Sequence, residues 1–541
     1  MLAIAAAAVI WRLLTDVAWH SLPLAIAILS LLPFMQFAVG ILPFSGQAWL
    51  GTAYLWGLLL ALLIGARWEE TTPGRAADGL FLAIGIAAVV SVGIQLRQWL
   101  GTTPDDGEIQ LWVANFAPGR PSANLGQPNQ LATLLLWAVL ACGWGVIRKK
   151  IHPLLAVCTI AYLLFGLALS QSRIALISML TITLLVWFWR NLWVSRSVPW
   201  VVTGLFGFLL VCTFSLQYLS DLLQLDVQIR SASLGGGSTQ LRLKAYSLFV
   251  NAAWHQPWWG YGWYQVPVAQ LAVAENNPSL SAFFSHSHNL FLDLILWCGL
   301  PIGILVSLFT LAWLLRCVRK VSTKEQAALC LFLIAVGLHA MVEFPLHYGY
   351  FLFPAGMVMG MLNHSQQNSV VMTTSRWTVM VIWLCTTALL IAIVRDYARV
   401  DDSFRIFRLE SARIGNTQPG GPPNVLILND MRAFIQNART SVGPDISEKS
   451  LLQLRDVTYS FPSPGNLFNY AKALAFRRKP VEAEAWIQKI VKVLPAEVSH
   501  AQQQMWQAQS LTQPAMAIVQ WPNSDPQPLE PSKSETPLQN P

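Results

Sequence analysis

The chain has 541 residues, of which 54% are hydrophobic and only 11% are charged, and its mean hydropathy is +0.48. Soluble domains carry about a quarter charged residues, so this composition excludes a soluble enzyme and a disordered chain. The seven cysteines form no Cys-x-x-Cys pair, which excludes a disulfide scaffold and gives no support to a zinc site. The net charge of +8 does not indicate nucleic-acid binding, because the 15 basic and 14 acidic residues after position 395 nearly cancel and the excess is scattered between apolar stretches.

Residues 1–395 contain repeated apolar stretches of the length needed to cross a bilayer, which is about 20 residues. Residues 1–14 are shorter and contain Arg12, so we interpret them as an interfacial segment or a clipped extra span rather than a cleaved signal peptide. The predicted fold class is an all-α polytopic membrane protein with about eleven transmembrane helices. We expect them at roughly 22–42, 48–66, 79–98, 129–147, 153–170, 174–189, 198–218, 289–315, 326–343, 349–363 and 377–394.

The basic residues between the predicted spans indicate an orientation. With a cytoplasmic N-terminus, thirteen Lys and Arg residues fall on one side and seven on the other. The excess of basic residues on the cytoplasmic side places a loop at 99–128, a large loop at 219–288 and the chain after 395 on the outer side of the membrane.

The sequence after the last predicted span has a different composition. A helical hairpin is predicted between Asn469 and Ile487, with its turn at Lys479-Pro480, and the Pro/Ser/Gln-rich end predicts disorder. The predicted domains are therefore a transmembrane domain (1–395), a helical domain on the outer side (396–512), which the resemblance described below implies to be periplasmic, and a disordered tail (513–541).

Polar residues of the outer face are the candidates for chemistry, and the run from Ser285 to Asn289 is the first of them. A histidine such as His288 is a candidate general base, because the pKa of histidine lies near neutrality, and Asn289 is placed to fix a tautomer or a substrate. The alternative is a loop end that only hydrogen-bonds the start of the following helix.

Two arginines of the same face are candidate anion-binding residues. Arg173 interrupts an apolar run between two closely joined spans, where a charge is expensive without an anionic partner. Guanidinium groups bind phosphate bidentately, so a lipid phosphate is a candidate ligand; snorkelling to the headgroups is the alternative. Arg242 and Lys244 in the large loop either add to such a site or belong to a solvated face.

Acidic residues form the last group of candidates. Glu343 precedes Pro345 between two predicted spans, and interrupted helices at membrane depth often line cavities. Asp293 lies one turn into the span that follows His288, so its side chain is also expected to face the interior of the helical bundle. Asp105-Asp106 lies in a Thr-Pro-Asp-Asp-Gly run, which is typical of a turn rather than a metal site.

Five segments, in chain order, resemble the signatures of the bacterial O-antigen ligase/polymerase superfamily, and within it the PglL-type protein O-oligosaccharyltransferases. Together they extend over about residues 120–355. The segments are Gly126–Ala132, Ser172-Arg173, Arg242 with Pro257, Gly260 and Gly262, His286–Asn289, and Glu343–Leu346 with Tyr348 and Phe351.

The resemblance implies an inverting, metal-independent glycosyl transfer at the periplasmic face of the inner membrane, with no cofactor. The donor would be an oligosaccharide on undecaprenyl diphosphate, and the acceptor a Ser or Thr hydroxyl of an exported, pilin-like protein. The resemblance assigns catalytic roles to His288, Gln127 and Tyr348, diphosphate contacts to Arg173 and Arg242, and supporting roles to His286, Asn289, Glu343, Asn129 and Tyr350, the last also as an alternative to Tyr348.

Three other functions remain open. An O-antigen ligase would transfer the same donor to lipid A–core, although the stretch Glu343–Phe351 and the soluble tail favour a protein acceptor. A polymerase of O-antigen repeats ranks after the protein O-oligosaccharyltransferase and the ligase. A transporter or lipid flippase without chemistry is disfavoured, because the sequence has no paired internal repeats and its polar candidates gather on one face.

Overall fold

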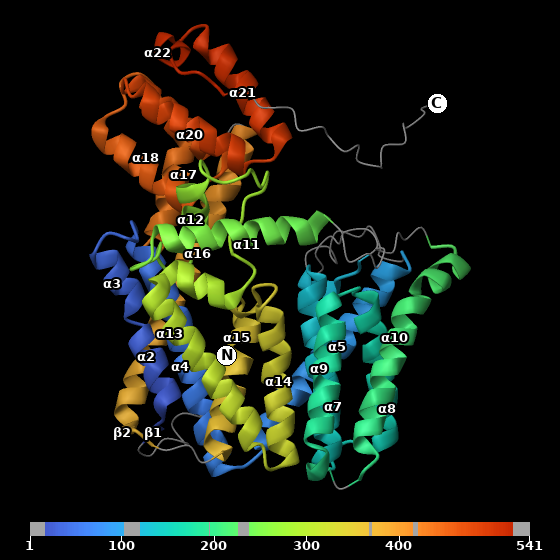
Figure 1. Ribbon diagram of the computed structural model, residues 1–541. Helices are drawn as coiled ribbons and strands as arrows, with labels where there is room; N and C mark the ends of the chain where they lie inside the picture. Colours follow the sequence, from blue (N-terminus) through green and yellow to red (C-terminus); the bar gives the residue numbers. More distant parts are fainter. Residues whose placement is uncertain are drawn as a thin grey trace.

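The computed structural model describes residues 17–101, 120–193, 195–225, 237–366, 370–414 and 420–522. Residues 1–14, the Asp105-Asp106 turn and the tail from 523, for which the sequence makes predictions, lie outside these ranges. Within them the chain forms a helical bundle with a smaller helical domain at one end (Figure 1). The bundle helices are α2 (Ser21–Leu29), α3 (Leu32–Ala38), α4 (Ser45–Thr71), α5 (Arg75–Trp99), α7 (Pro128–Ile147), α8 (Pro153–Leu169), α9 (Arg173–Phe188), α10 (Val198–Leu222), α13 (Leu290–Lys320), α14 (Lys324–Ala340), α15 (Gly349–Ser365) and α16 (Arg376–Ser411).

Each predicted span coincides with one of these helices, except that the first is divided into two helices and the span at 289–315 is broken inside α13. Ser30 ends α2 and Pro33 lies in the first turn of α3, so the stretch 22–42 is two short helices. Seven helical segments of the described chain are long and apolar enough to cross a membrane, counting α2 and α3 as one, and α8 and α9 are shorter apolar helices. The chain is thus an all-α, multi-pass membrane protein apart from one small feature. A two-stranded antiparallel sheet pairs β1 (Val17–Trp19) with β2 (Met372–Thr374).

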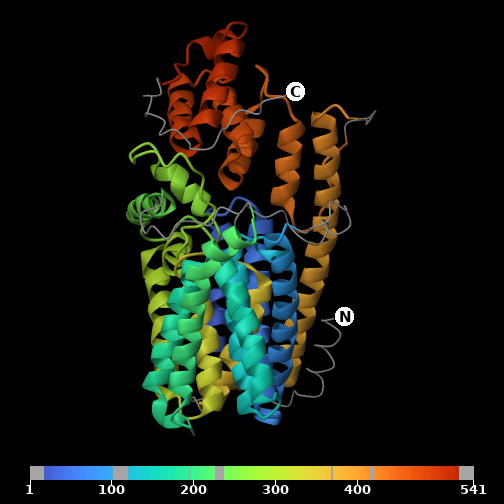
Figure 2. The same cartoon turned by 90° about the vertical axis from the view of Figure 1, so that its right-hand side faces the viewer.

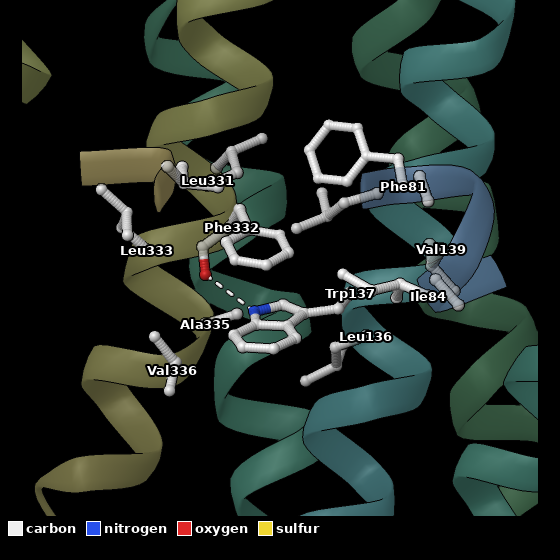
Figure 3. Packing of buried hydrophobic residues seen from close by; sticks show 14 of the residues in the cluster. Phe81, Ile84, Leu136, Trp137, Val139, Leu331, Phe332, Leu333, Ala335 and Val336 are labelled. Carbon is white, nitrogen blue, oxygen red and sulfur yellow. Dashed lines mark hydrogen bonds between the residues drawn. The ribbon is translucent and has the colours of Figure 1, made fainter. Parts of the chain in front are cut away.

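The centre of the bundle is formed by α7 and α14, which are buried on most sides. The Trp137 ring on α7 stacks on Phe332 of α14 with centroids 4.0 Å apart, and its Nε1 donates to the Phe332 carbonyl at 2.9 Å (Figure 3). Since a buried indole N–H without an acceptor would be costly, this bond fixes the two helices against each other.

The tightest helix pair is α4 with α15, where glycines allow the two backbones to touch. A Cβ on Gly360 would lie 2.0 Å from the Leu62 carbonyl oxygen, and one on Gly65 would lie 2.1 Å from that of Met357. Small residues that permit such approach are typical of helix packing in membranes. This contact holds α15, and so the segment before it, close to α4.

The predicted span at 289–315 is not one continuous helix. Inside α13, Gly299 adopts φ +80° and ψ 168°, which breaks the helix just before Pro301. The loop 257–262 fills the break: Leu300 N donates to the Pro257 carbonyl, and Tyr261 N and Gly262 N donate to the carbonyls of Leu296 and Trp297. The polar groups freed by the break are therefore satisfied within the protein, as helix interruptions in membrane proteins require.

Two helices cross the end of the bundle at which α7, α9, α13 and α15 begin, called the site end below. They are α11 (Gly237–His255) and α12 (Val266–Val273), and both come from the predicted large loop. The smaller domain stands on the same end and is reached by α16, which continues through the expected boundary at 395 as one helix (Figure 2). Its helices are α17 (Asn429–Arg439), α18 (Glu448–Ser460), α19 (Pro464–Phe476), α20 (Pro480–Val493), α21 (Ala496–Ser510) and α22 (Pro514–Ala517).

The predicted hairpin is formed by α19 and α20, and Lys479-Pro480 lies at its turn. The helical domain also continues past 512, where disorder was expected, because Met516 and Val519 are buried in its core. Burial of these two apolar side chains stabilises the packing of the segment on the domain, although its Pro and Gln content is typical of a disordered chain.

Candidate active site

The Glu343 carboxylate lies at the centre of the site end and contacts side chains from three other segments. Arg242 Nη2 lies 2.5 Å from its Oε1, Asn129 Nδ2 donates to the same oxygen at 3.2 Å, and His288 Nδ1 lies 3.1 Å from its Oε2. Ser172 joins through Asn129, whose Oδ1 accepts from the Ser172 hydroxyl at 2.8 Å. All five segments singled out in the sequence thus converge, although more than 200 residues separate the first from the last.

Glu343 follows the C-terminus of α14 and is buried, with its side chain only 7% exposed. Burial alone would raise the pKa of this carboxyl, but the hydrogen bond from His288 and the charge of Arg242 outweigh that effect and lower the pKa. The carboxylate is therefore ionised at neutral pH, and Arg242 supplies the positive charge that a buried anion needs.

His288 is held in a strained backbone conformation just before α13. Its φ of +60° lies in the left-handed region, which is uncommon for a residue other than glycine. Tyr246 donates to the His288 carbonyl at 3.2 Å, and Asn289 caps α13 by accepting from the backbone N–H groups of Phe291 and Leu292. Strain maintained by several contacts is characteristic of functional sites.

The contact with Glu343 also determines what the His288 ring can do. A neutral ring next to a carboxylate carries its proton on Nδ1 and donates it to that carboxylate, which leaves Nε2 as an acceptor. The arrangement resembles the pairing of a base with an orienting acid in hydrolytic triads. His288 is 21% exposed on its side chain, so the site remains accessible to a substrate.

The other predicted residues lie around this centre. Gln127 caps α7, and its Oε1 accepts from Gln130 N at 2.8 Å. Arg173 is the first residue of α9, directly after Ser172, where the helix dipole adds to the positive potential of the side chain. Tyr350 donates to Gln130 Oε1 at 2.5 Å, which joins the start of α15 to α7.

Tyr348 and His286 contribute rings beside the same centre. The Tyr348 ring stacks with Phe344, with centroids 6.0 Å apart, and the His286 ring lies 3.5 Å from the Phe344 centroid. Burial, together with neighbouring histidines, lowers the pKa of His286 to about 3, so this ring is neutral at physiological pH. His286 is thus closer to a packing role than His288.

The sequence interpretation missed several residues that support the site. Tyr246, on the same face of α11 as Arg242, holds the His288 backbone, and its spacing of four residues from Arg242 is the only signal that marked it. Gln36 on α3 is buried, donates to the Trp297 carbonyl and accepts from Trp263 N, which fixes the loop 257–262 to the broken α13. Asp293, which was considered, accepts from Ser287 N at 2.8 Å. Nothing in the local sequence predicts the partners of Gln36, because they lie more than 220 residues away.

The described residues contain no group of three or more His, Cys, Asp or Glu placed to hold a metal ion. All seven cysteines lie in the described ranges and are free thiols.

Models of known families match three parts of the chain. The O-antigen ligase model matches residues 158–307, the protein glycosylation ligase model residues 121–144, and the model of the C-terminal part of the virulence factor membrane-bound polymerases residues 327–509. The three matches together include every segment that meets at Glu343.

Two curated relatives from Acinetobacter baylyi are similar over long alignments. A general O-oligosaccharyltransferase is 28% identical over 462 residues, which are 82% of this chain and 78% of the relative. A ComP-specific O-oligosaccharyltransferase is 30% identical over 339 residues, 61% of this chain and 59% of that relative. No solved structure matches the chain. The matched families and the two relatives agree with the resemblance of the five segments: the chain is similar to the O-antigen ligase superfamily and, within it, to PglL-type protein O-oligosaccharyltransferases.

Proposed function

We propose that this protein glycosylates other proteins by transferring a preassembled oligosaccharide from undecaprenyl diphosphate to Ser or Thr hydroxyls of exported, pilin-like proteins. The transfer takes place at the periplasmic face of the bacterial inner membrane and inverts the anomeric centre. The observation that carries the proposal is the Glu343 carboxylate, which orders His288 and Arg242 in one site.

In the proposed reaction, His288 Nε2 accepts the proton of the acceptor hydroxyl while the hydroxyl oxygen attacks the anomeric carbon. The bond from that carbon to the donor phosphate breaks, and its electron pair leaves with the lipid diphosphate. Glu343 keeps the ring oriented through Nδ1 and stabilises the imidazolium that forms, as the acid of a triad does.

The leaving diphosphate gains negative charge, so it requires cations that are already in place. A guanidinium has five N–H donors, and the contact of Arg242 with Glu343 uses one nitrogen, which leaves donors for a phosphate. Arg173, at the N-terminus of α9, is the second proposed contact. Gln127 and Tyr348 are proposed to bind the sugar or the acceptor at the same end of the bundle.

The proposed acceptor distinguishes this protein from an O-antigen ligase with the same chemistry. A helical domain stands directly on the site end, where an acceptor protein would approach, and the two curated relatives carry the name oligosaccharyltransferase. We further propose residues 1–395 as the catalytic membrane domain and the helices after it as a periplasmic domain.

The test is co-expression with a pilin-like acceptor in cells that supply a lipid-linked glycan. The wild-type chain is expected to shift the acceptor's mobility, and His288→Ala to reduce the transfer rate by about 10²- to 10⁴-fold, the contribution typical of a general base. Full activity of His288→Ala would refute the proposed base. Modification of lipid A–core without any protein product would replace the proposal with a ligase function.

A further inference from the structure

The helix α11 has three distinct faces along its length. Its buried face, formed by residues such as Leu248, Phe249 and Ala252, packs on the site end of the bundle. A neighbouring face carries Arg242 and Tyr246, which contact Glu343 and the His288 backbone. The third face is exposed, although it is largely apolar.

That exposed face forms a narrow stripe along α11. Leu243, Ser247, Val250 and Trp254 follow at intervals of four, three and four residues, which places them within about 60° of one another around a helix. Leu243 is 63% exposed, Val250 49% and Trp254 69%. We call these four residues the outer stripe.

The polar residues on the two sides of the outer stripe differ in what they contact. Lys244, Asn251 and His255 lie about 90° around the helix from the stripe and are exposed, whereas Arg242 and Tyr246 lie on the other side and point into the site. This order, from apolar to polar across a quarter turn, matches a helix that lies along the boundary between hydrocarbon and water.

The position of α11 agrees with that placement. It lies across the site end, almost perpendicular to the bundle helices in Figure 1, and Figure 2 shows it end-on at the edge of the bundle rather than above its centre. A helix at the edge of a membrane domain, at the level where the spans end, is adjacent to lipid headgroups.

The chain that follows the outer stripe is also exposed and apolar, and it contacts a helix that is apolar enough to cross the membrane. Trp258 and Trp259 follow α11, are 71% and 61% exposed, and belong to the loop whose backbone fills the break at Gly299 of α13. Below that break, α13 exposes Leu305 and Leu308 in a segment apolar enough to cross the membrane. Trp254 of the stripe and Trp258 and Trp259 of the loop are thus three exposed tryptophans at the end of α11 that leads to this apolar segment, as expected of an aromatic belt.

We infer that α11 is an interfacial helix whose outer stripe is embedded in the bilayer at the site end while its opposite side assembles the site through Arg242 and Tyr246. The partner of the stripe is the lipid surface itself, and the helix thereby couples contact with the membrane to the position of His288 and Glu343. The inference concerns where α11 lies and does not depend on which glycan or acceptor is used.

Photo-crosslinking in nanodiscs of phosphatidylethanolamine and phosphatidylglycerol tests this placement. A photo-reactive phenylalanine analogue replaces Trp254 or Val250 on the stripe, and, as matched controls, Asn251 on the polar border of the same helix or Leu511, which is 87% exposed on the smaller domain. Lipid adducts, detected by mass spectrometry of the crosslinked peptide, are expected when the analogue is at position 254 or 250. No lipid adduct is expected when it is at position 251 or 511.

Equal lipid adducts at 251 and 254, or none at either stripe position, would overturn the inference. Adducts from 254 to another protein, when the crosslinking is done in cells, would show that a protein partner covers the stripe instead.

A second measurement is hydrogen exchange of residues 241–255 in the same nanodiscs. The double variant V250D/W254D is expected to lose protection there, whereas N251D retains it, and equal protection in both would also contradict the inference. Neither readout requires glycan transfer, so a failure of the proposed function leaves this test intact.

Discussion

The charge balance around Glu343 explains why three side chains meet at one carboxylate. A buried anion is costly unless it is paired and hydrogen-bonded, and Arg242, Asn129 and His288 together satisfy both oxygens. Arg242 neutralises the ground-state charge, so a proton gained by His288 would be stabilised by a carboxylate that is already ionised and in place. The site is thus preorganised for a positive charge on the ring.

Replacing Glu343 by Gln keeps the size of the side chain but removes its charge. We expect the rate of glycan transfer to fall by about 10²-fold or more, because Gln keeps only one oxygen, for which Arg242 and Asn129 compete with the ring, and because the charge that stabilises the imidazolium is lost. Acceptor mobility shifts over a time course measure this rate. Asn129→Ala removes one neutral hydrogen-bond donor from Glu343 Oε1 and is expected to reduce the transfer rate less than Glu343→Gln does. A larger loss of rate in Asn129→Ala would contradict the central role of the carboxylate.

Two histidines beside the site make stability depend on pH. Burial lowers the pKa of His347 to about 4 and of His286 to about 3, from an ordinary value of 6.5. At a pH below 6.5 but above these lowered pKa values, both histidines are protonated in the unfolded chain and neutral in the folded chain. The free energy of unfolding therefore falls as the pH drops from about 6.5 toward 4. The Glu343 pKa is lowered from 4.5, so its contribution is lost only at more acidic pH.

We therefore expect the melting temperature of the detergent-solubilised protein to be lower at pH 5 than at pH 7.5. His347→Phe should reduce this difference, because the His347 ring lies among aromatic rings and, among the described residues, no group hydrogen-bonds its Nε2. The control is His500→Phe at an exposed position of α21, which should leave the difference unchanged. A His347→Phe variant with the full pH sensitivity would contradict the assignment.

At the scale of elements, hydrophobic patterning predicted where helices form but not where they break. Each expected span corresponds to a helix, because a stretch of about 20 apolar residues is a strong local signal. The break at Gly299 depends instead on carbonyls satisfied from residues 257–262 and from Gln36, which are distant in the sequence. The same limit applies to the site: its residues were recognisable by resemblance, whereas the Glu343 contacts that join them are all long-range.

Gly260 tests the break directly. Its φ is +66°, and an added Cβ would lie 2.5 Å from the Gly299 nitrogen, so Gly260→Ala must displace the loop from α13. We expect a loss of about 1–3 kcal/mol in unfolding free energy from strain and lost backbone hydrogen bonds. Thermal unfolding in detergent measures it.

The matched control for Gly260→Ala is Gly337→Ala in α14, where an added Cβ meets nothing within 4 Å. Alanine is favoured over glycine inside a helix, so this variant should be neutral or slightly stabilised. If both variants unfold at the same temperature, the contact between the loop and the broken helix does not stabilise the fold.

At the scale of the whole molecule, the smaller domain is attached to the membrane domain at several points. The Asp396 Oδ2 accepts from the backbone N–H groups of residues 426–428, and the Asn429 side chain bonds Ser45 and Gly46 N at the start of α4. On the other side, Leu271 of α12 is fully buried in the core of the smaller domain. The change in composition after 395 predicted a separate domain, but it did not predict this docking, because the contacts join residues far apart in the chain.

Docking through α12 has a consequence for the site, because residues 274–287 lead from α12 to His288. Ser279 donates to the Lys492 carbonyl at 2.9 Å, and Glu275 pairs with Lys489 at 3.4 Å, so this connecting segment contacts α20. Leu271→Asp places a charge in the domain core and should release the segment. We expect reduced glycan transfer and faster proteolysis between 266 and 288, although every residue of the site is retained. Leu511→Asp, at a position 87% exposed on the same domain, is the control and should change neither. Unchanged transfer in Leu271→Asp, with cleavage confirming that the segment has been released, would mean that the bundle alone positions His288.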